Sequence, residues 1–199
     1  MSRKLQPRVW TTKTYNKLSP YYDRFMKFFF PLGEKGRERI VDKLVSGSVL
    51  DVACGTGTLL ALAENKGLKC YGIDLSEGML AQAKKKVSAA ELRIASYYEI
   101  PYTGGVFDYV VATNALSGVF IDARKVLLEM LRVCRVGGWI YIAEWPKALE
   151  DTYSERLVVW FASLNDDAPK DYCTIFQNLG YEPEVDVLSK RYHVYGIRK

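Results

Sequence analysis

The chain has 199 residues, of which 49% are hydrophobic and 26% are charged, and its net charge is +5. This balance excludes global disorder and fits one globular domain. No apolar run reaches the roughly 18 residues of a membrane-spanning helix, and residues 1–10 lack the apolar stretch of a signal peptide. Four separated cysteines and a single histidine argue against a disulfide framework or a metal site. We therefore expect a cytoplasmic protein with buried, reduced thiols and no metal.

The positive charge is concentrated at the start of the chain. Residues 1–50 carry eleven Lys or Arg and four Asp or Glu, a net of +7, whereas the rest of the chain has a net of −2. Such a segment can contact an anionic membrane surface, or it can be the solvated face of helices. Its basic residues are scattered among aromatic ones rather than clustered, which argues against nucleic-acid binding.

In chain order, residues 10–45 indicate two or three short helices, broken at Pro20, Pro31 and Gly33. From residue 48 onward, short apolar runs alternate with amphipathic helical stretches at 57–66, 77–90 and 122–134. The apolar runs cover 48–53, 69–74, 91–95, 107–113 and 139–145. Strands separated by helices of this length predict βαβ units, a parallel sheet and helices on both faces.

The pattern changes after residue 145. A helix at 148–164 and another at 169–179 precede two strands, 184–189 and 192–197, which we expect to form an antiparallel hairpin. The predicted fold class is α/β, with a doubly wound, mostly parallel seven-stranded sheet, a terminal antiparallel hairpin and an N-terminal helical cap. We expect a single domain made of a cap (1–46), a core (47–146), a helical insertion (147–167) and a closing helix and hairpin (168–199).

A glycine-rich turn, Ala53-Cys54-Gly55-Thr56-Gly57, joins the first core strand to the next helix. Its glycines let a ligand approach the backbone, and the helix N-terminus offers unpaired N–H groups to an anion. The dinucleotide pattern GxGxxG would need glycine where Leu60 stands, and the phosphate-binding GxxxxGK[ST] pattern is absent. A carboxylate fits better than a phosphate, with Asp51 near an adjacent ammonium group. Together these groups match the amino-acid end of S-adenosylmethionine.

A second acidic residue ends the next strand. Asp74 lies 17 residues beyond Gly57, where an acid can accept hydrogen bonds from both ribose hydroxyls. Its alternative role is to cap the helix at 77–90. Ser76 is better placed as that N-cap, so we assign Asp74 to the ribose.

Four segments together resemble the class I S-adenosylmethionine-dependent methyltransferases. They are VLDVACGTG, YGIDLSEGML, ASYYEIPY before FDYVVATNAL, and LLEMLRVCRVGGWIYIAEW. The resemblance covers about residues 20–199 and is greatest to the branch with the ubiquinone and menaquinone C-methyltransferases. It implies a Rossmann-like fold and S-adenosyl-L-methionine as cofactor, with S-adenosyl-L-homocysteine as product.

The turn and the resemblance together predict a set of cofactor-binding residues. Ser96 and Tyr97 stand where the family reads adenine, but the family's usual residue at position 96 is Asp or Asn, so the contact of Ser96 stays open. The segments after Asp23 and at 115–118 differ from those of the quinone enzymes, so the resemblance supports the reaction more than a quinone acceptor. The predicted set is Tyr22, Asp51, Ala53, Cys54, Gly55, Thr56, Gly57, Asp74, Leu75, Met79, Ser96, Tyr97, Thr113 and Asn114.

No catalytic base is assigned. His193 reads as a structural strand residue, and Glu144, at the end of a strand, is a candidate to contact the substrate. Aromatic residues of the cap and insertion either line an apolar substrate pocket, where Tyr21 or Tyr22 would face the sulfonium, or only cover the sheet. The aromatic residues are Tyr15, Tyr21, Tyr22, Phe25, Phe28, Phe29, Phe30, Trp160 and Phe161, and Met26 lies among those of the cap.

The sequence thus predicts a methyltransferase that acts on a small aromatic or apolar acceptor. Two alternatives remain open. One is a cofactor-binding module or partner subunit without its own catalysis. The other is a methyltransferase for protein or nucleic acid, although TNAL at 113–116 is not a base-methylation NPPY motif. The oligomeric state and the acceptor atom are not predicted.

Overall fold

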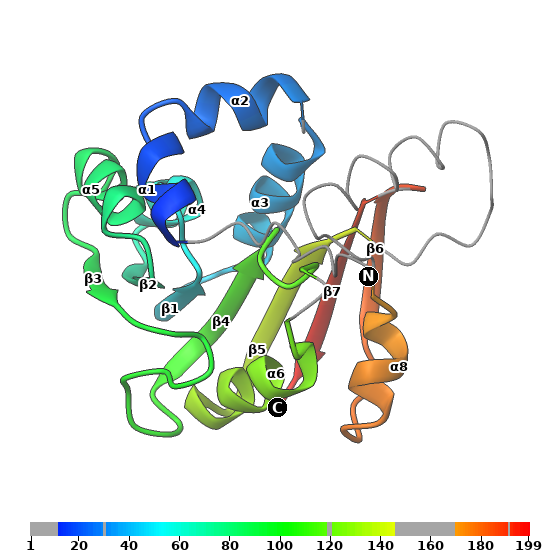
Figure 1. Ribbon diagram of the computed structural model, residues 1–199. Coiled ribbons are helices and arrows are strands. Elements are labelled where there is room, and N and C mark those ends of the chain that lie inside the picture. Colours follow the sequence, from blue (N-terminus) through cyan, green and yellow to red (C-terminus); the bar gives the residue numbers. More distant parts are fainter. Residues whose placement is uncertain (1–11, 30, 119–120, 146–169, 191) are drawn as a thin grey trace, which may run out of the picture.

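The structure, a computed structural model, describes residues 12–29, 31–118, 121–145, 170–190 and 192–199. Its centre is a seven-stranded sheet in the order β3-β2-β1-β4-β5-β7-β6 (Figure 1). Neighbouring strands are parallel except β7, which is antiparallel to β5 and β6. The predicted fold class is confirmed. The strands are β1 (Ser48–Val52), β2 (Lys69–Asp74), β3 (Glu91–Ile94), β4 (Phe107–Thr113), β5 (Cys134–Glu144), β6 (Glu184–Ser189) and β7 (Tyr192–Arg198).

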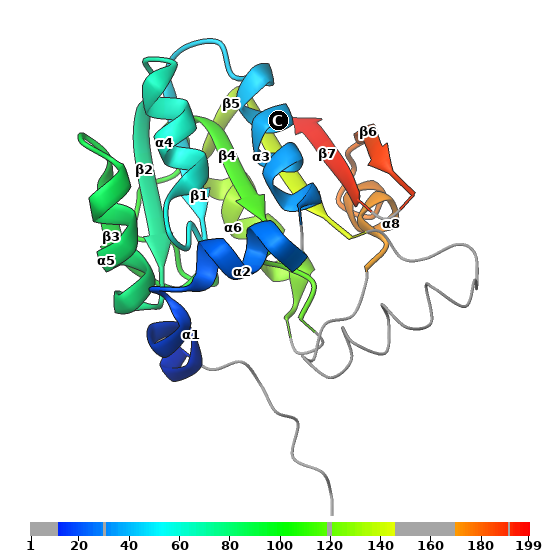
Figure 2. The same cartoon turned by 90° about the horizontal axis from the view of Figure 1, so that it is seen from above.

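Helices cover both faces of the sheet, as Figure 2 shows from above. The helices α3 (Leu32–Lys43), α4 (Thr58–Asn65) and α5 (Glu77–Lys86) pack on one face, and α6 (Ala123–Val133) and α8 (Tyr172–Gln177) on the other. Successive residues of a strand point to opposite faces, so Val49 joins the first core and Leu50 the second. Burial on both faces explains why the strands read as continuous apolar runs.

The N-terminal cap contains α1 (Thr12–Leu18) and α2 (Tyr22–Phe29), followed by α3. Pro20 and Pro31 lie between these helices, as expected. The break predicted at Gly33 is wrong, because Gly33 lies inside α3 and is buried. Its missing side chain has another use: a Cβ there would stand 2.8 Å from the Asn114 side-chain nitrogen.

Two further boundaries differ from expectation. The fifth strand was expected at residue 139 but begins at Cys134, which pairs with Phe107 ahead of a register shift in β4. Gly137, with φ of +76°, lets the backbone of β5 bend there. The expected helix at 148–164, and with it Trp160, lies outside the described residues.

The terminal hairpin is present, since β6 and β7 pair antiparallel. Cys54, Cys70 and Cys134 are buried free thiols, and Cys173 is half-buried. Among the helices that the structure describes, none combines the length and the apolar composition needed to cross a membrane.

Candidate functional site

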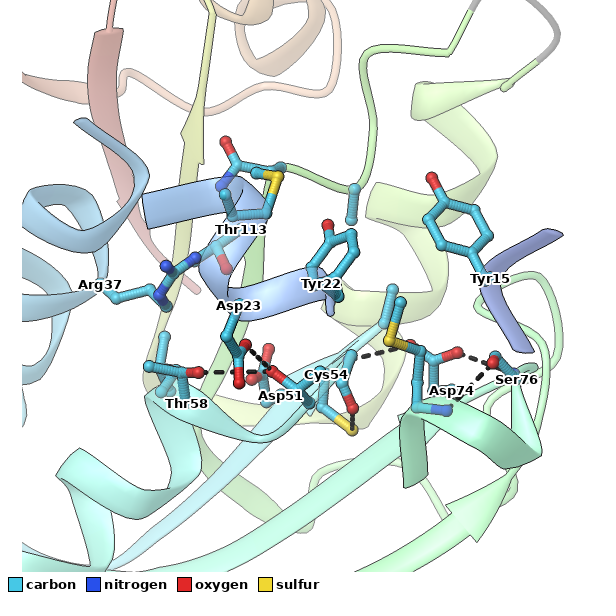
Figure 3. Close-up of a pocket in the computed structure, with 18 of the residues that line it drawn as sticks. Tyr15, Tyr22, Asp23, Arg37, Asp51, Cys54, Thr58, Asp74, Ser76 and Thr113 are labelled. Atoms are coloured by element: carbon cyan, nitrogen blue, oxygen red, sulfur yellow. Dashed lines mark hydrogen bonds between the residues drawn. The ribbon is translucent and has the colours of Figure 1, made fainter. Parts of the chain in front are cut away.

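A cavity of about 740 Å³ opens at the carboxyl ends of β1, β2 and β4, beneath the cap helices α1 and α2 (Figure 3). In doubly wound sheets, ligands bind at this edge. Twelve of the fourteen predicted cofactor-binding residues line the cavity. They are Tyr22, Asp51, Ala53, Cys54, Gly55, Thr56, Asp74, Leu75, Met79, Tyr97, Thr113 and Asn114.

The glycine-rich turn forms one wall of the cavity through an unusual backbone path. Ala53, Gly55 and Gly57 all have positive φ, at 59°, 53° and 74°. The turn is held by Asp74, whose carboxylate accepts hydrogen bonds from the Gly55 N–H at 2.9 Å and the Ser76 N–H at 2.8 Å. Each oxygen of the Asp74 carboxylate thus already accepts one hydrogen bond from the backbone. Each carboxylate oxygen keeps further acceptor capacity.

The helix α5 begins as predicted. The Ser76 hydroxyl accepts a hydrogen bond from the Met79 N–H at 3.1 Å, so Ser76 is the N-cap. This leaves the Asp74 carboxylate to hold the turn and to face the cavity.

Gly57 and Ser96 do not line the cavity. A Cβ at Gly57 would stand 2.8 Å from the Ala83 Cβ, so this glycine allows α5 to approach the turn rather than a ligand to approach the backbone. The Ser96 hydroxyl accepts a hydrogen bond from the Tyr98 N–H at 3.1 Å, within its own turn. The structure therefore offers Tyr97, and not Ser96, to a ligand in the cavity.

Two acidic residues of the cavity, Asp51 and Asp74, have raised pKa values. Asp51 is 2% exposed, and its Oδ1 has no hydrogen-bond partner among the described residues. Burial raises the pKa of Asp51 to about 8, against the opposing effect of Arg37, and burial also raises the pKa of Asp74. A buried carboxylate is stabilised by a nearby cation, so the cavity fits a positively charged ligand.

A polar cluster joins the cap to the turn, and its charged members were not predicted from the sequence. Lys86, at the end of α5, forms an ion pair with Asp23 of α2. Lys86 also donates to the Thr56 and Thr58 hydroxyls at 2.9 Å, and the Thr56 hydroxyl donates to Asp23. The Thr56 hydroxyl therefore binds the cap. The lysine had no sequence signal, since it follows Lys84 and Lys85 in an ordinary basic helix end.

The other candidates for catalysis have structural positions. Glu144 is fully buried and accepts hydrogen bonds from the Ala115 and Leu116 N–H groups, so its carboxylate positions the loop after β4. His193 is half-buried on β7 beside the Tyr195 hydroxyl and does not line the cavity. Burial raises the pKa of the Cys54 thiol well above its ordinary value, so this cavity residue is no thiolate nucleophile.

The comparisons with known proteins agree with this geometry. The profile of the methyltransferase-domain family matches residues 50–142. A demethylmenaquinone methyltransferase of Bacillus mycoides is 37% identical over 131 residues, which make up 62% of this chain and 55% of the relative. The chain therefore carries a methyltransferase domain over residues 50–142. S-adenosyl-L-methionine is therefore its cofactor.

Two solved structures share the fold of this methyltransferase. The complex of DhpI with S-adenosyl-L-homocysteine has a TM-score of 0.70 at 18% identity, with 94% of both chains covered. The geranyl diphosphate C-methyltransferase of Streptomyces coelicolor has a TM-score of 0.68 at 13% identity, and the match covers 83% of this chain and 78% of that one. At such identities the likeness shows the fold alone.

The two glycines of the turn can be separated by experiment. Both have positive φ, so alanine costs about 1–2 kcal/mol of backbone strain at either site. A Cβ at Gly55 meets nothing within 4 Å and lies beside the cavity, whereas one at Gly57 meets Ala83. We expect Gly55→Ala to fold and to lose at least about tenfold in affinity for S-adenosylhomocysteine. We expect Gly57→Ala to show the larger loss of unfolding free energy.

Calorimetry and denaturant unfolding give the two readouts. Gly67→Ala is the matched control, because Gly67 also has positive φ and open space around it but lies outside the cavity lining. A Gly55→Ala protein that binds the cofactor product as tightly as the Gly67→Ala protein contradicts the assignment.

Proposed function

We propose that this methyltransferase transfers the methyl group to a small aromatic or apolar acceptor that enters beside the cap. The observation that carries the proposal is the pair of buried carboxylates, Asp51 and Asp74, beside a turn of positive φ in one cavity. A sulfonium cofactor that also carries an ammonium group matches this pair of acids, because its positive charge stabilises their ionised forms. Asp51 receives the ammonium group, and the turn at the N-terminus of α4 receives the carboxylate.

Asp74 binds the ribose hydroxyls, and Leu75, Met79 and Tyr97 enclose the adenine. Asp74 is the last residue of β2, and the other three follow β2 or β3; all four line the cavity. When bound, the cofactor supplies an electrophilic methyl group, and the protein supplies position and electrostatics. Holding the reacting atoms in line at about 3–3.5 Å can contribute about 7–11 kcal/mol.

The acceptor side is formed by the cap, the end of β4 and the loop that follows it. Tyr15, Tyr22 and Met26 line the cavity, whereas Tyr21 and Phe28 are 72% and 79% exposed. The expectation that Tyr21 faces the ligand is therefore not supported. Phe30, Trp160 and Phe161 lie outside the described residues. This proposal also includes three expectations from the sequence. They are contact of the cap with an anionic membrane surface, a cytoplasmic location, and the division of the chain into cap, core and insertion.

The ribose assignment provides the main test. We expect Asp74→Ala to weaken S-adenosylhomocysteine binding at least about tenfold, since a hydrogen bond to a charged group contributes about 1.5–3 kcal/mol. The 2′,3′-dideoxy analogue of this ligand should bind the wild-type protein more weakly, and Asp74→Ala should weaken it little further. Glu77→Ala, an exposed acid on the first turn of α5, is the control. Equal affinity of the wild-type protein for both ligands contradicts the ribose assignment. Turnover is tested separately, by offering methyl-labelled cofactor together with small-molecule extracts.

Asp51 predicts a pH dependence of cofactor binding. Its pKa of about 8 keeps it protonated near neutral pH, and a bound ammonium group favours the ionised form. Binding should therefore release a proton, and the affinity for S-adenosylhomocysteine should rise between about pH 6 and pH 8. Calorimetry in buffers of different ionisation enthalpy measures that proton. Asp51→Asn should abolish the release, and a pH-independent wild-type affinity would argue against the role.

Tyr22 and Tyr21 are adjacent but differ in position, which makes them a matched pair. Tyr22 lines the cavity and meets Tyr15 edge to face at 6.2 Å, while Tyr21 faces solvent. An aromatic face near a cation contributes about 0.5–2 kcal/mol. We expect Tyr22→Ala to weaken S-adenosylmethionine binding about three- to tenfold and Tyr21→Ala to leave it unchanged. Equal effects of the two changes in calorimetry would reject a cavity role for the cap.

A further inference from the structure

Two buried hydrogen-bond donors of the cavity have no partner among the described residues. They are the Nε of Arg37, on α3, and the Nδ2 of Asn114, which follows β4. Both residues line the cavity. In Figure 3 the Arg37 guanidinium points from α3 toward the middle of the cavity, on the side of Thr113 and away from Asp74 and Ser76.

The orientation of the Asn114 amide is fixed by its neighbours. The Tyr192 hydroxyl lies 2.8 Å from the Asn114 Oδ1 and 3.1 Å from the Ala143 carbonyl oxygen, and the shorter contact is to Oδ1; the Asn114 backbone N–H donates to the same Ala143 carbonyl at 3.0 Å. The Asn114 backbone has a φ of +52°, which is uncommon outside glycine and points to a constrained position. Since Oδ1 already accepts from Tyr192, the amide presents its NH₂ group to the remaining space.

The two side chains meet over one glycine. A Cβ at Gly33 would stand 2.8 Å from the Asn114 Nδ2 and 3.7 Å from the Arg37 Nη1. Any side chain at position 33 would therefore push against the Asn114 amide and touch the Arg37 guanidinium. The buried glycine that was expected to break the helix instead leaves room for both side chains.

Unpaired buried donors are rare, because each costs about 1–3 kcal/mol of lost hydration. Two donors with no acceptor between them call for a ligand that accepts, and the guanidinium favours one that carries negative charge. The site lies at the end of β4, whereas the ribose anchor Asp74 is the last residue of β2, two strands away in the sheet. The ligand group bound here is therefore distant from the ribose.

We propose that Arg37 and Asn114 bind an anionic oxygen of the methyl acceptor, either a carboxylate or an ionised hydroxyl group. This inference rests on the proposed function and narrows its acceptor to molecules that carry such a group. The carboxylate of the cofactor has the same chemistry. The turn at the N-terminus of α4 serves that group, and the experiment separates the two sources.

The test uses two probes of equal shape, benzoate and benzamide, offered to the full chain saturated with S-adenosylhomocysteine. Calorimetry should show benzoate binding at least about tenfold more tightly than benzamide, as expected for a charge-assisted hydrogen bond. Arg37→Met should remove this preference. Asn114→Asp keeps an acceptor for Tyr192 but replaces the NH₂ donor by an oxygen. It should also weaken the binding of benzoate and leave the binding of benzamide unchanged.

Arg39→Met is the matched control, because Arg39 lies on the same helix, pairs with Asp186 and does not line the cavity. It should retain the benzoate preference. If Arg37→Met fails to fold, Asn114→Asp decides on its own. The inference is wrong if the wild-type protein does not prefer benzoate over benzamide. It is also wrong if Arg37→Met keeps this preference and weakens only S-adenosylhomocysteine binding, because the guanidinium would then bind the cofactor. Wild type that fails to bind S-adenosylhomocysteine refutes the proposed function instead.

Discussion

The carboxylate of Asp74 joins the two turns on which the cavity depends. One oxygen accepts the Gly55 N–H from the turn after β1, and the other accepts the Ser76 N–H from the turn after β2. The strands are parallel and paired up to Val52 and Ile73, so both turns leave the sheet at the same level. The backbone of positive φ at Gly55 is thereby held open toward the cavity, and α4 and α5 both begin from this anchored edge.

The position of the cap follows from the same two turns. The Asn16 side chain of α1 accepts hydrogen bonds from the Ser76 hydroxyl at 2.6 Å and the Gly78 N–H at 2.9 Å. In α2, Asp23 accepts from Thr56 and pairs with Lys86. Each cap helix is thus attached to one of the turns that Asp74 holds. Any ligand that fills the cavity must fit beneath the cap while these contacts persist or are exchanged.

The sequence allowed the sheet, the glycine-rich turn and the cavity edge to be predicted because these features are local. Apolar runs mark strands buried on both faces, and the spacing from Gly57 to Asp74 follows from one βα unit. Gly57 and Ser96 could not be assigned in this way. Their roles depend on the approach of α5 and on a hydrogen bond within a turn, and neither leaves a pattern in the sequence.

Arg37 and Lys86 were missed for a related reason. The chain holds 28 lysines and arginines, and no periodicity distinguishes the few that face the cavity from those in solvent. Gly33 was misread because a glycine in a helix resembles a break when its neighbour across the fold is unknown. Only the position of Asn114 explains why a side chain is absent there. The roles of these residues therefore depend on long-range contacts between α3 and the end of β4, which local sequence patterns do not reveal.

The cavity holds both acidic and basic side chains, and their placement bears on the chemistry. Asp51 and Asp74, on β1 and β2, can supply negative charge to a bound cation, while the Arg37 guanidinium, which opposes the rise in the pKa of Asp51, supplies positive charge from α3. The acids stabilise a positively charged reactant and the guanidinium stabilises a negatively charged one. A methyl transfer between these two reactants neutralises both. A cavity of low dielectric favours such a loss of charge, because dispersed charge needs less solvation than separated ions. The protein would then need no base in the cavity, which agrees with the fact that neither His193 nor Glu144 lines it.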